Sequence, residues 1–150
     1  MRHLFLLCLP LILLPATAQA AGWESGMVED EGGPVMQAWV EGEGGDVPPE
    51  LRMMCGDGVM LRYGFGSGPG EEAALPDTPQ DFAFDFGDST ITLSMQLEEM
   101  DGMFAAYFPA SDPVIAALKS SASVTVNDPT GVWHEQAFPL TGSSRAIDAV

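Results

Sequence analysis

Hydrophobic and polar residues alternate with a period of two along several short segments of the chain, which is the pattern of half-buried β-strands. The clearest case is residues 82–86, in which every second residue is Phe. After Gly87-Asp88 the alternation continues in residues 91–97, in which every second residue is Ile, Leu or Met. A Gly-Asp turn between two such segments predicts an antiparallel hairpin.

A second hairpin is predicted in residues 51–65. Residues 51–55 and 59–65 flank Gly56-Asp57-Gly58, and Asp-Gly between apolar runs is the strongest short hairpin signal. We expect residues 59–65 to place their large apolar side chains on one face and Met60 and Arg62 on the other. The same kind of pattern predicts further strands over residues 34–41, 103–109, 123–127 and 132–140.

One helix has clear signals at its start. Asp112 can cap the free amide groups of the first turn, and Pro113 suits the first helical position. The buried stripe that follows is formed by Val114, Ile115 and Leu118. We also expect the tail, residues 142–150, to contain a final helical turn.

These elements predict a mainly β fold, an antiparallel β-sandwich or flattened barrel of about seven or eight short strands with one short α-helix. Three parts of the chain are distinguished by their composition. Residues 1–20 are predicted to be a secretory signal peptide, and residues 21–33 a loose acidic segment leading into the domain. Residues 34–150 are predicted to form a single β-rich domain.

The signal peptide is predicted from the order of its parts. Arg2 and His3 give a positive start, residues 4–14 are apolar except for Pro10, and Ala18-Gln19-Ala20 fits a small-x-small cleavage site. The apolar run is too short to span a bilayer. The sequence therefore predicts a periplasmic or secreted protein without a membrane span, from a Gram-negative bacterium.

Charge excludes several classes of partner. The chain has 22 acidic and 5 basic residues, a formal net charge of −17. Cleavage after Ala20 removes Arg2 and leaves four cations, which are Arg52, Arg62, Lys119 and Arg145. Nucleic acids and anionic membranes are bound through many Lys and Arg side chains, so both are excluded as partners.

Candidate catalytic residues are few. Cys55 is the cysteine that remains after removal of Cys8 with the signal peptide, so no internal disulfide is expected, and a buried, inert thiol is the favoured interpretation. A Cys55–His134 pair is a hypothesis that no motif supports, and no GxSxG elbow is present. A glycosidase-like pair of carboxylates stays open as an alternative, although most acids occupy solvated positions. We assign no catalytic residue and no cofactor.

Two kinds of metal site are weighed as alternatives. Oxygen ligands for calcium are offered by two acidic sets, Asp81, Asp85 and Asp88 or Glu98, Glu99 and Asp101. Soft sulfur ligands for Cu(I) are offered by Met53, Met54 and Cys55. Neither set has a recognised motif spacing, and methionine commonly fills irregular cores, so no metal ligand is assigned.

The Gly- and Pro-rich residues 64–79 are the least regular part of the predicted domain. Their glycines lack the spacing of a nucleotide-binding loop, and no Gly-Lys-Ser or Gly-Lys-Thr follows. This segment is either a binding surface or a tether.

The order of several motifs resembles two families of small secreted β-domains. Trp23 near the expected mature start, Leu51-x-x-x-Cys55, the helix from Asp112, and Phe138-x-Leu140-x-Gly142-x-x-x-Ala146 occur in sequence. This order is similar to that of type VI secretion-associated VasI proteins and, more weakly, of invasion-associated locus B proteins. The resemblance implies a β-rich periplasmic domain without known catalytic residues.

A second resemblance concerns the hairpin alone. Cys55-x-x-Gly58-x-x-Leu61-x-x-x-Phe65 is similar to a strand of the membrane-bound and periplasmic C-type lysozyme inhibitors, which are small secreted β-barrels. The leading hypothesis is a non-enzymatic protein-interaction domain whose partner is another envelope or secreted protein. Inhibition of a cationic lysozyme is the alternative, and its partner would be attracted by the acidic chain.

Overall fold

The structure is a computed structural model that describes residues 22–150 except 31, 57, 67–75, 129 and 134. Its described part contains a nine-stranded antiparallel sheet and two short helices. The strands are β1 (Glu24–Asp30), β2 (Gly33–Glu41), β3 (Glu50–Cys55), β4 (Val59–Gly64), β5 (Gln80–Asp85), β6 (Thr90–Glu98), β7 (Met103–Phe108), β8 (Ser123–Asn127) and β9 (Gln136–Pro139). The predicted signal peptide lies outside the described residues.

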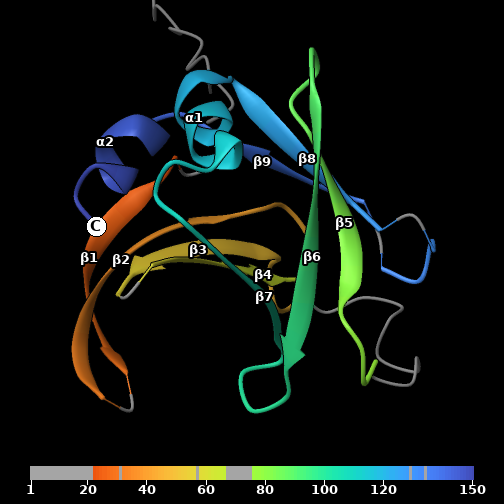
Figure 1. The fold of residues 1–150 in the computed structure, drawn as a ribbon, viewed down its shortest axis with the longest axis horizontal. Helices are drawn as coiled ribbons and strands as arrows, with labels where there is room; N and C mark the ends of the chain where they lie inside the picture. Colours follow the sequence, from red (N-terminus) through yellow and green to blue (C-terminus); the bar gives the residue numbers. More distant parts are fainter. Residues whose placement is uncertain (1–21, 31, 57, 67–75, 129, 134) are drawn as a thin grey trace, which may run out of the picture.

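The strands form one sheet in the order β1-β2-β3-β4-β7-β6-β5-β8-β9. The long strand β6 serves both halves of this sheet, because its residues 90–95 pair with β5 and its residues 96–98 pair with β7. The sheet bends at this strand. In Figure 1, β3, β4 and β7 run across the middle, β5 and β6 rise along one side, and β8 and β9 return across the top.

The core lies inside the bend and is rich in aromatic side chains. Tyr63 of β4 meets Phe82 of β5 and Phe138 of β9 edge-on, with ring centroids 5.4 and 6.2 Å apart. Phe104 of β7 packs on Phe82, and their ring centroids are 4.8 Å apart. These four rings come from both halves of the sheet and are almost completely buried, so their contacts hold the bend closed.

Two helices cover the open end of the bend. In α1 (Pro113–Ser120), the Asp112 carboxylate accepts a 3.0 Å hydrogen bond from the Val114 amide, as the sequence predicts. Val114 and Leu118 are buried, whereas Ile115 is only partly buried. The second helix, α2 (Ser143–Ile147), follows Gly142, whose φ of 81° favours glycine. An ion pair between Lys119 and Asp148 joins the ends of the two helices.

The mainly β, antiparallel class is confirmed, and several details differ from the expectation. The structure has nine strands in its described part, where about seven or eight were expected, and the final helical turn expected in residues 142–150 is present as α2. Residues 24–30, expected to belong to a loose segment, form the edge strand β1. The sequence pattern did not predict this strand because of its acidic residues, which an edge strand tolerates since it needs no continuous apolar face. The last strand covers residues 136–139 rather than 132–140.

The core position of Phe84 gives a first prediction. Phe84→Ala is expected to lower the free energy of unfolding by about 3–5 kcal/mol, because the ring is fully buried and its removal leaves a cavity. Denaturant unfolding measures this change. Asp81→Ala, on the exposed side of the same strand, is the control and should change stability by less than about 0.5 kcal/mol. A loss below about 1 kcal/mol for Phe84→Ala would contradict the described core.

The cap of α1 gives a second prediction. Asp112→Ala is expected to cost about 1 kcal/mol, because the Val114 amide loses its acceptor. Asp112→Asn is the matched control, since an amide oxygen can accept the same hydrogen bond. Thermal unfolding of the three proteins measures the difference, and equal melting midpoints for Asp112→Ala and the wild type would refute the cap.

Candidate functional site

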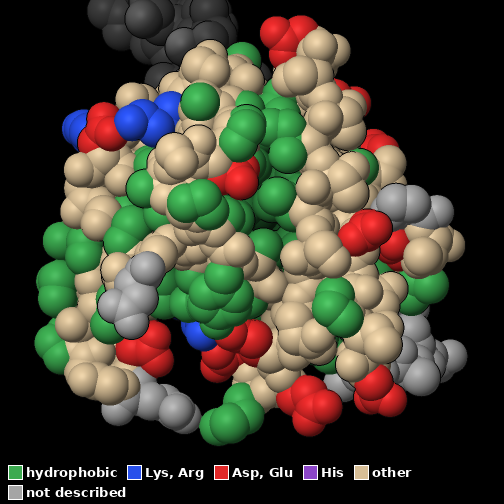
Figure 2. Space-filling model, viewed as in Figure 1, with side chains coloured by type: hydrophobic (Ala, Val, Ile, Leu, Met, Phe, Trp, Pro, Cys, Tyr) green, Lys and Arg blue, Asp and Glu red, His purple; other side chains and the backbone are tan. Residues whose placement is uncertain are grey.

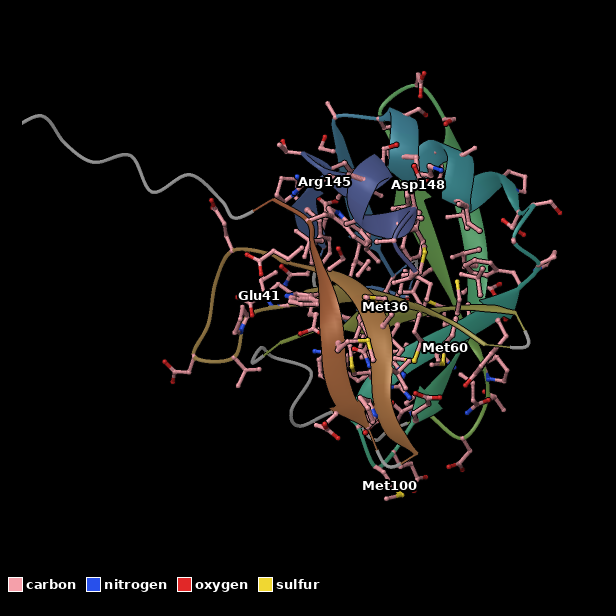
Figure 3. All side chains as sticks on the ribbon, turned by 90° about the vertical axis from the view of Figure 1, so that its left-hand side faces the viewer. Met36, Glu41, Met60, Met100, Arg145 and Asp148 are labelled. Carbon is pink, nitrogen blue, oxygen red and sulfur yellow. The ribbon has the colours of Figure 1, made fainter. Side chains whose placement is uncertain are left out.

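The outer face of the sheet is hollowed along β3, β4 and β7. The hollow lies between the β1–β2 hairpin and the turn that joins β6 to β7, and Figure 2 shows it with basic and acidic side chains gathered at its roof. The end of the hairpin and Met100 of that turn lie at the same end of the molecule (Figure 3). Asp30 of β1 lines one depression together with Glu99 and Met100. We call this hollow the trough.

The trough exists because the sheet also curls around its outer face. Gln37 and Met54 are directly opposite each other on β2 and β3, and both point away from the aromatic core. A flat sheet would expose them, but they are only 1% and 7% exposed. Curling therefore gives the outer face a sheltered concave surface.

One part of the trough is apolar. Met54, Met60 and Tyr107 lie in one row across β3, β4 and β7, because Met54 is the register partner of Met60 and Met60 that of Tyr107. They line a depression of about 580 Å³, whose full set of lining residues is Met54, Cys55, Gly56, Gly58, Met60, Tyr107, Phe108 and Pro109. We call this depression the apolar pocket. Its size lies within the range of small ligand pockets, and it is open to solvent on one side.

The neighbouring part of the trough is charged. Arg62, two residues along β4 from Met60, contacts Glu98 through Nε at 2.7 Å and Asp101 through Nη2 at 3.1 Å. Arg52 is directly opposite Arg62, and its Nε lies 2.6 Å from Oε1 of Glu50. Two like charges in direct cross-strand positions are unfavourable unless they are neutralised, and these acids neutralise them. Because the acids at least balance the two guanidinium groups, the trough is not built to bind anions.

Tyr107 joins the apolar and the charged parts. Its ring lines the apolar pocket and is 70% exposed, and its hydroxyl donates a 2.8 Å hydrogen bond to Glu98. This hydrogen bond is the main reason why the pKa of Tyr107 lies above its ordinary value, with smaller contributions from burial and from the charge of Glu98. The bond fixes a large exposed ring in one orientation.

Cys55 corrects the expectation of a buried thiol. It is exposed at the end of β3 and lines the apolar pocket. The apolar pattern of residues 51–55 suggested burial, but the strand ends here and its last side chain passes beyond the core. The hypothetical partner His134 lies outside the described residues.

The candidate metal ligands are not brought together. Among the described residues, no three His, Cys, Asp or Glu side chains gather at a point where they could hold a metal ion. Asp81 and Asp85 lie on the exposed side of β5, while Glu98 and Asp101 hold Arg62. The sulfur-bearing set is divided by strand alternation, because Met53 lies in the core, whereas Met54 and Cys55 line the apolar pocket.

Asp128 is a buried carboxylate that the structure uses to shape a loop. It accepts hydrogen bonds from the Thr130 hydroxyl and from three amides, those of Thr130, Val132 and Trp133. Burial by itself raises the pKa of Asp128, but these hydrogen bonds outweigh it and hold the pKa below its ordinary value. The loop places the centroid of the Trp133 ring 4.5 Å from that of Phe65 and 5.3 Å from that of Phe104. Since its hydrogen bonds go to its own loop, the carboxylate has a structural role.

None of the helices in the described part of the chain is long and apolar enough to cross a membrane.

Comparisons with known proteins give a likeness of fold. No protein-family model matches the chain, and no curated protein matches it. The crystal structure of invasion associated protein B from Bartonella henselae matches with a TM-score of 0.51 and 15% sequence identity, over 89% of this chain and 93% of that chain. At this identity the likeness shows the fold alone. It confirms the expected fold of invasion-associated locus B proteins, and it does not support the more specific likeness to VasI proteins.

Sequence reasoning missed Tyr107 and assigned Met60 only to a face. A signal was present, because residues 103–108 carry large or apolar side chains on both faces. A strand at a fully solvated outer face would alternate with polar residues. That both faces of this strand are apolar indicates a second sheltered surface, which is the trough.

The hydrogen-bonded Asp128 predicts a pH dependence. The pKa of Asp128 is lower in the folded state than in the unfolded chain, where it is about 3.9. The ionised carboxylate therefore stabilises the fold above this unfolded pKa, and this stabilisation is lost as the pH falls through the folded pKa. Asp128→Asn should therefore lose about 1.5–3 kcal/mol at neutral pH, and this loss should shrink as the pH falls through the lowered pKa of Asp128 in the folded state. Unfolding measured from pH 7 to pH 2 tests this, with exposed Asp77→Asn as control. A difference between variant and wild type that stays constant with pH would contradict it.

Proposed function

We propose that this chain is a periplasmic or secreted, non-enzymatic protein-interaction domain of a Gram-negative bacterium, and that the trough is its docking surface. The observation that carries the proposal is the apolar pocket with the exposed, hydrogen-bonded ring of Tyr107 at its side. A large aromatic side chain held in one orientation beside an open apolar depression is typical of an interface anchor.

The chemistry of the trough selects the partner. Met54 and Met60 offer flexible, polarisable surfaces that adapt to an apolar side chain. Glu98, Glu99 and Asp101 give the neighbouring end of the trough an acidic character. The partner is therefore a cationic protein that inserts an apolar side chain into the apolar pocket and places basic residues toward the acidic end.

The charge of the whole chain supports the same partner. A net charge of −17 attracts a cationic protein over long distances and accelerates association at low ionic strength. The predicted signal peptide supports an envelope or extracellular location. A cationic lysozyme is the alternative partner, favoured by this charge, and in that case the chain acts as an inhibitor.

The proposal predicts which side chains carry binding. The chain without residues 1–20 is used to capture partners from periplasmic extract, and the affinity of each purified partner is then measured by titration calorimetry. Tyr107→Ala and Met60→Ser should each weaken binding by about tenfold or more, because they remove the anchor and its pocket. Binding should also weaken with added salt. Val132→Ala, which truncates an exposed apolar side chain between β8 and β9, is the matched control.

Several outcomes would overturn parts of the proposal. A partner that binds Tyr107→Ala as tightly as the wild type does not use the trough. Unchanged activity of a cationic lysozyme at low ionic strength ends the inhibitor alternative. Turnover of a substrate by the purified chain in a panel of hydrolase assays, including glycosidases, would contradict the non-enzymatic function.

A further inference from the structure

Three sulfur-bearing side chains line the apolar pocket. They are Met54 and Cys55 of β3 and Met60 of β4. The sequence suggested a sulfur set that included Met53, but Met53 lies in the core, and the fold brings Met60 to the pocket in its place. The structure therefore gathers one thiol and two thioethers from two different strands.

The pairing of β3 with β4 holds these side chains close together. Met54 is directly opposite Met60, and Cys55 is opposite Val59 in the next register pair. Directly opposite residues have Cβ atoms about 4.5–5.5 Å apart. Methionine is unbranched and flexible, so its sulfur can move toward a shared point over such a distance. Cys55 is a free cysteine with an exposed side chain, so its thiol is available at the same place.

The turn between the two strands is held beside Cys55. The Gly56 amide donates a 2.9 Å hydrogen bond to the Gly58 carbonyl. A Cβ atom built on Gly58 would lie 3.4 Å from the Phe108 carbonyl oxygen, so this end of the turn lies against the end of β7. The backbone around the thiol is therefore fixed, and the thiol keeps its place at the pocket.

The chemistry of the pocket selects a soft metal ion. Thiolate and thioether sulfur together favour Cu(I). Zinc instead takes Cys, His or carboxylate ligands, and calcium takes oxygen ligands. The described residues that line the pocket include one Cys and no His, Asp or Glu, and the hydroxyl of Tyr107 is already hydrogen-bonded to Glu98. The described part of the pocket therefore offers zinc and calcium too few side-chain ligands.

Charge favours the same ion. A Cu(I) ion held by one thiolate and two neutral thioethers is electrically neutral, which suits a pocket that Phe108 and Pro109 also line. Arg62, two residues along β4 from Met60, is neutralised by Glu98 and Asp101. The net charge of −17 also attracts cations to the molecule.

We propose that Met54, Cys55 and Met60 form a Cu(I) site at the apolar pocket. On binding, the Cys55 thiol gives its proton to solvent and its sulfur bonds to the ion, while the copper stays Cu(I) and no electron is transferred. This site does not rest on the proposed docking function, because copper binding is measured without a partner. Tyr107→Ala, which should weaken docking, should leave the Cu(I) affinity unchanged.

The first measurement is a competition for Cu(I). The chain without residues 1–20 is titrated without oxygen against bicinchoninate, a coloured Cu(I) chelator. We expect one ion to be retained per chain, and we expect neither Zn(II) nor Ca(II) to displace it. Transfer of all the copper to the chelator would overturn the proposal, as would displacement of Cu(I) by an equal concentration of Zn(II).

A second measurement locates the ion with Ag(I), a soft probe that does not change oxidation state under these conditions. The methionine methyl resonances are assigned with single Met→Leu variants. One equivalent of Ag(I) should shift the resonances of Met54 and Met60 and leave that of Met100, which is 86% exposed and lies apart from Met60 (Figure 3). Equal shifts at all three methionines would contradict a defined site.

Variants of the three sulfur residues test each ligand. Cys55→Ser should weaken Cu(I) binding by about a hundredfold, and Met54→Leu or Met60→Leu by about tenfold each, because even groups around a metal's ligands contribute about ten- to hundredfold. Met→Leu conserves volume and apolar character, so the fold should persist. Met100→Leu is the matched control and should bind as the wild type does.

Three results with these variants would overturn the site. Wild-type affinity in a Met54→Leu, Met60→Leu double variant would mean that the thiol alone holds the ion. Wild-type affinity in Cys55→Ser would mean that the ion lies elsewhere. A copper-dependent dimer in sedimentation that is lost in Cys55→Ser would mean that two chains share the ion, whereas the proposed site belongs to one chain.

Discussion

Burial of aromatic rings from distant strands is the constraint on which the rest of this structure depends. Tyr63, Phe82, Phe104 and Phe138 belong to four strands, and they meet only if the sheet bends far enough to bring its two halves together. The bend requires β6 to pair with β7 over one part of its length and with β5 over the other. The loop organised by Asp128 adds Trp133 to this core, so a buried carboxylate also contributes to the same packing.

The same curvature produces the surface features of the molecule. Curling around the outer face shelters Met54 and Gln37 and leaves the apolar pocket and the charged part of the trough beside each other. Two of the four cations expected in the mature chain, Arg52 and Arg62, are used there to neutralise acids within the fold. Apart from the buried Asp128, the described acids outside the trough lie at the surface, so the apolar pocket is set in an acidic molecule.

The candidate site could be predicted only in part, and the reason differs between residues. The alternation of residues 59–65 correctly placed Met60 and Arg62 on the face opposite the core. It could not show that this face is sheltered, because shelter arises from the curl of β1 and β2 over it. Cys55 has an apolar neighbourhood in sequence but lies at a strand end, where exposure depends on what packs beyond the strand. The acidic sets that suggested calcium are adjacent in sequence, but Glu98 and Asp101 are engaged by Arg62 from another strand.

Local sequence determined the antiparallel hairpins, the capped helix and the mainly β class. Alternation, Gly-Asp and Asp-Gly turns, and the Asp-Pro helix start act over a few residues, and their energies do not need distant partners. Composition likewise determined the strong net negative charge, from which nucleic acids and anionic membranes are not expected as partners. Tertiary structure decided the number of strands in one sheet, the terminal position of β1 in that sheet, and the trough. These depend on which strands become neighbours, and that choice is made by long-range burial of the aromatic core rather than by any local pattern.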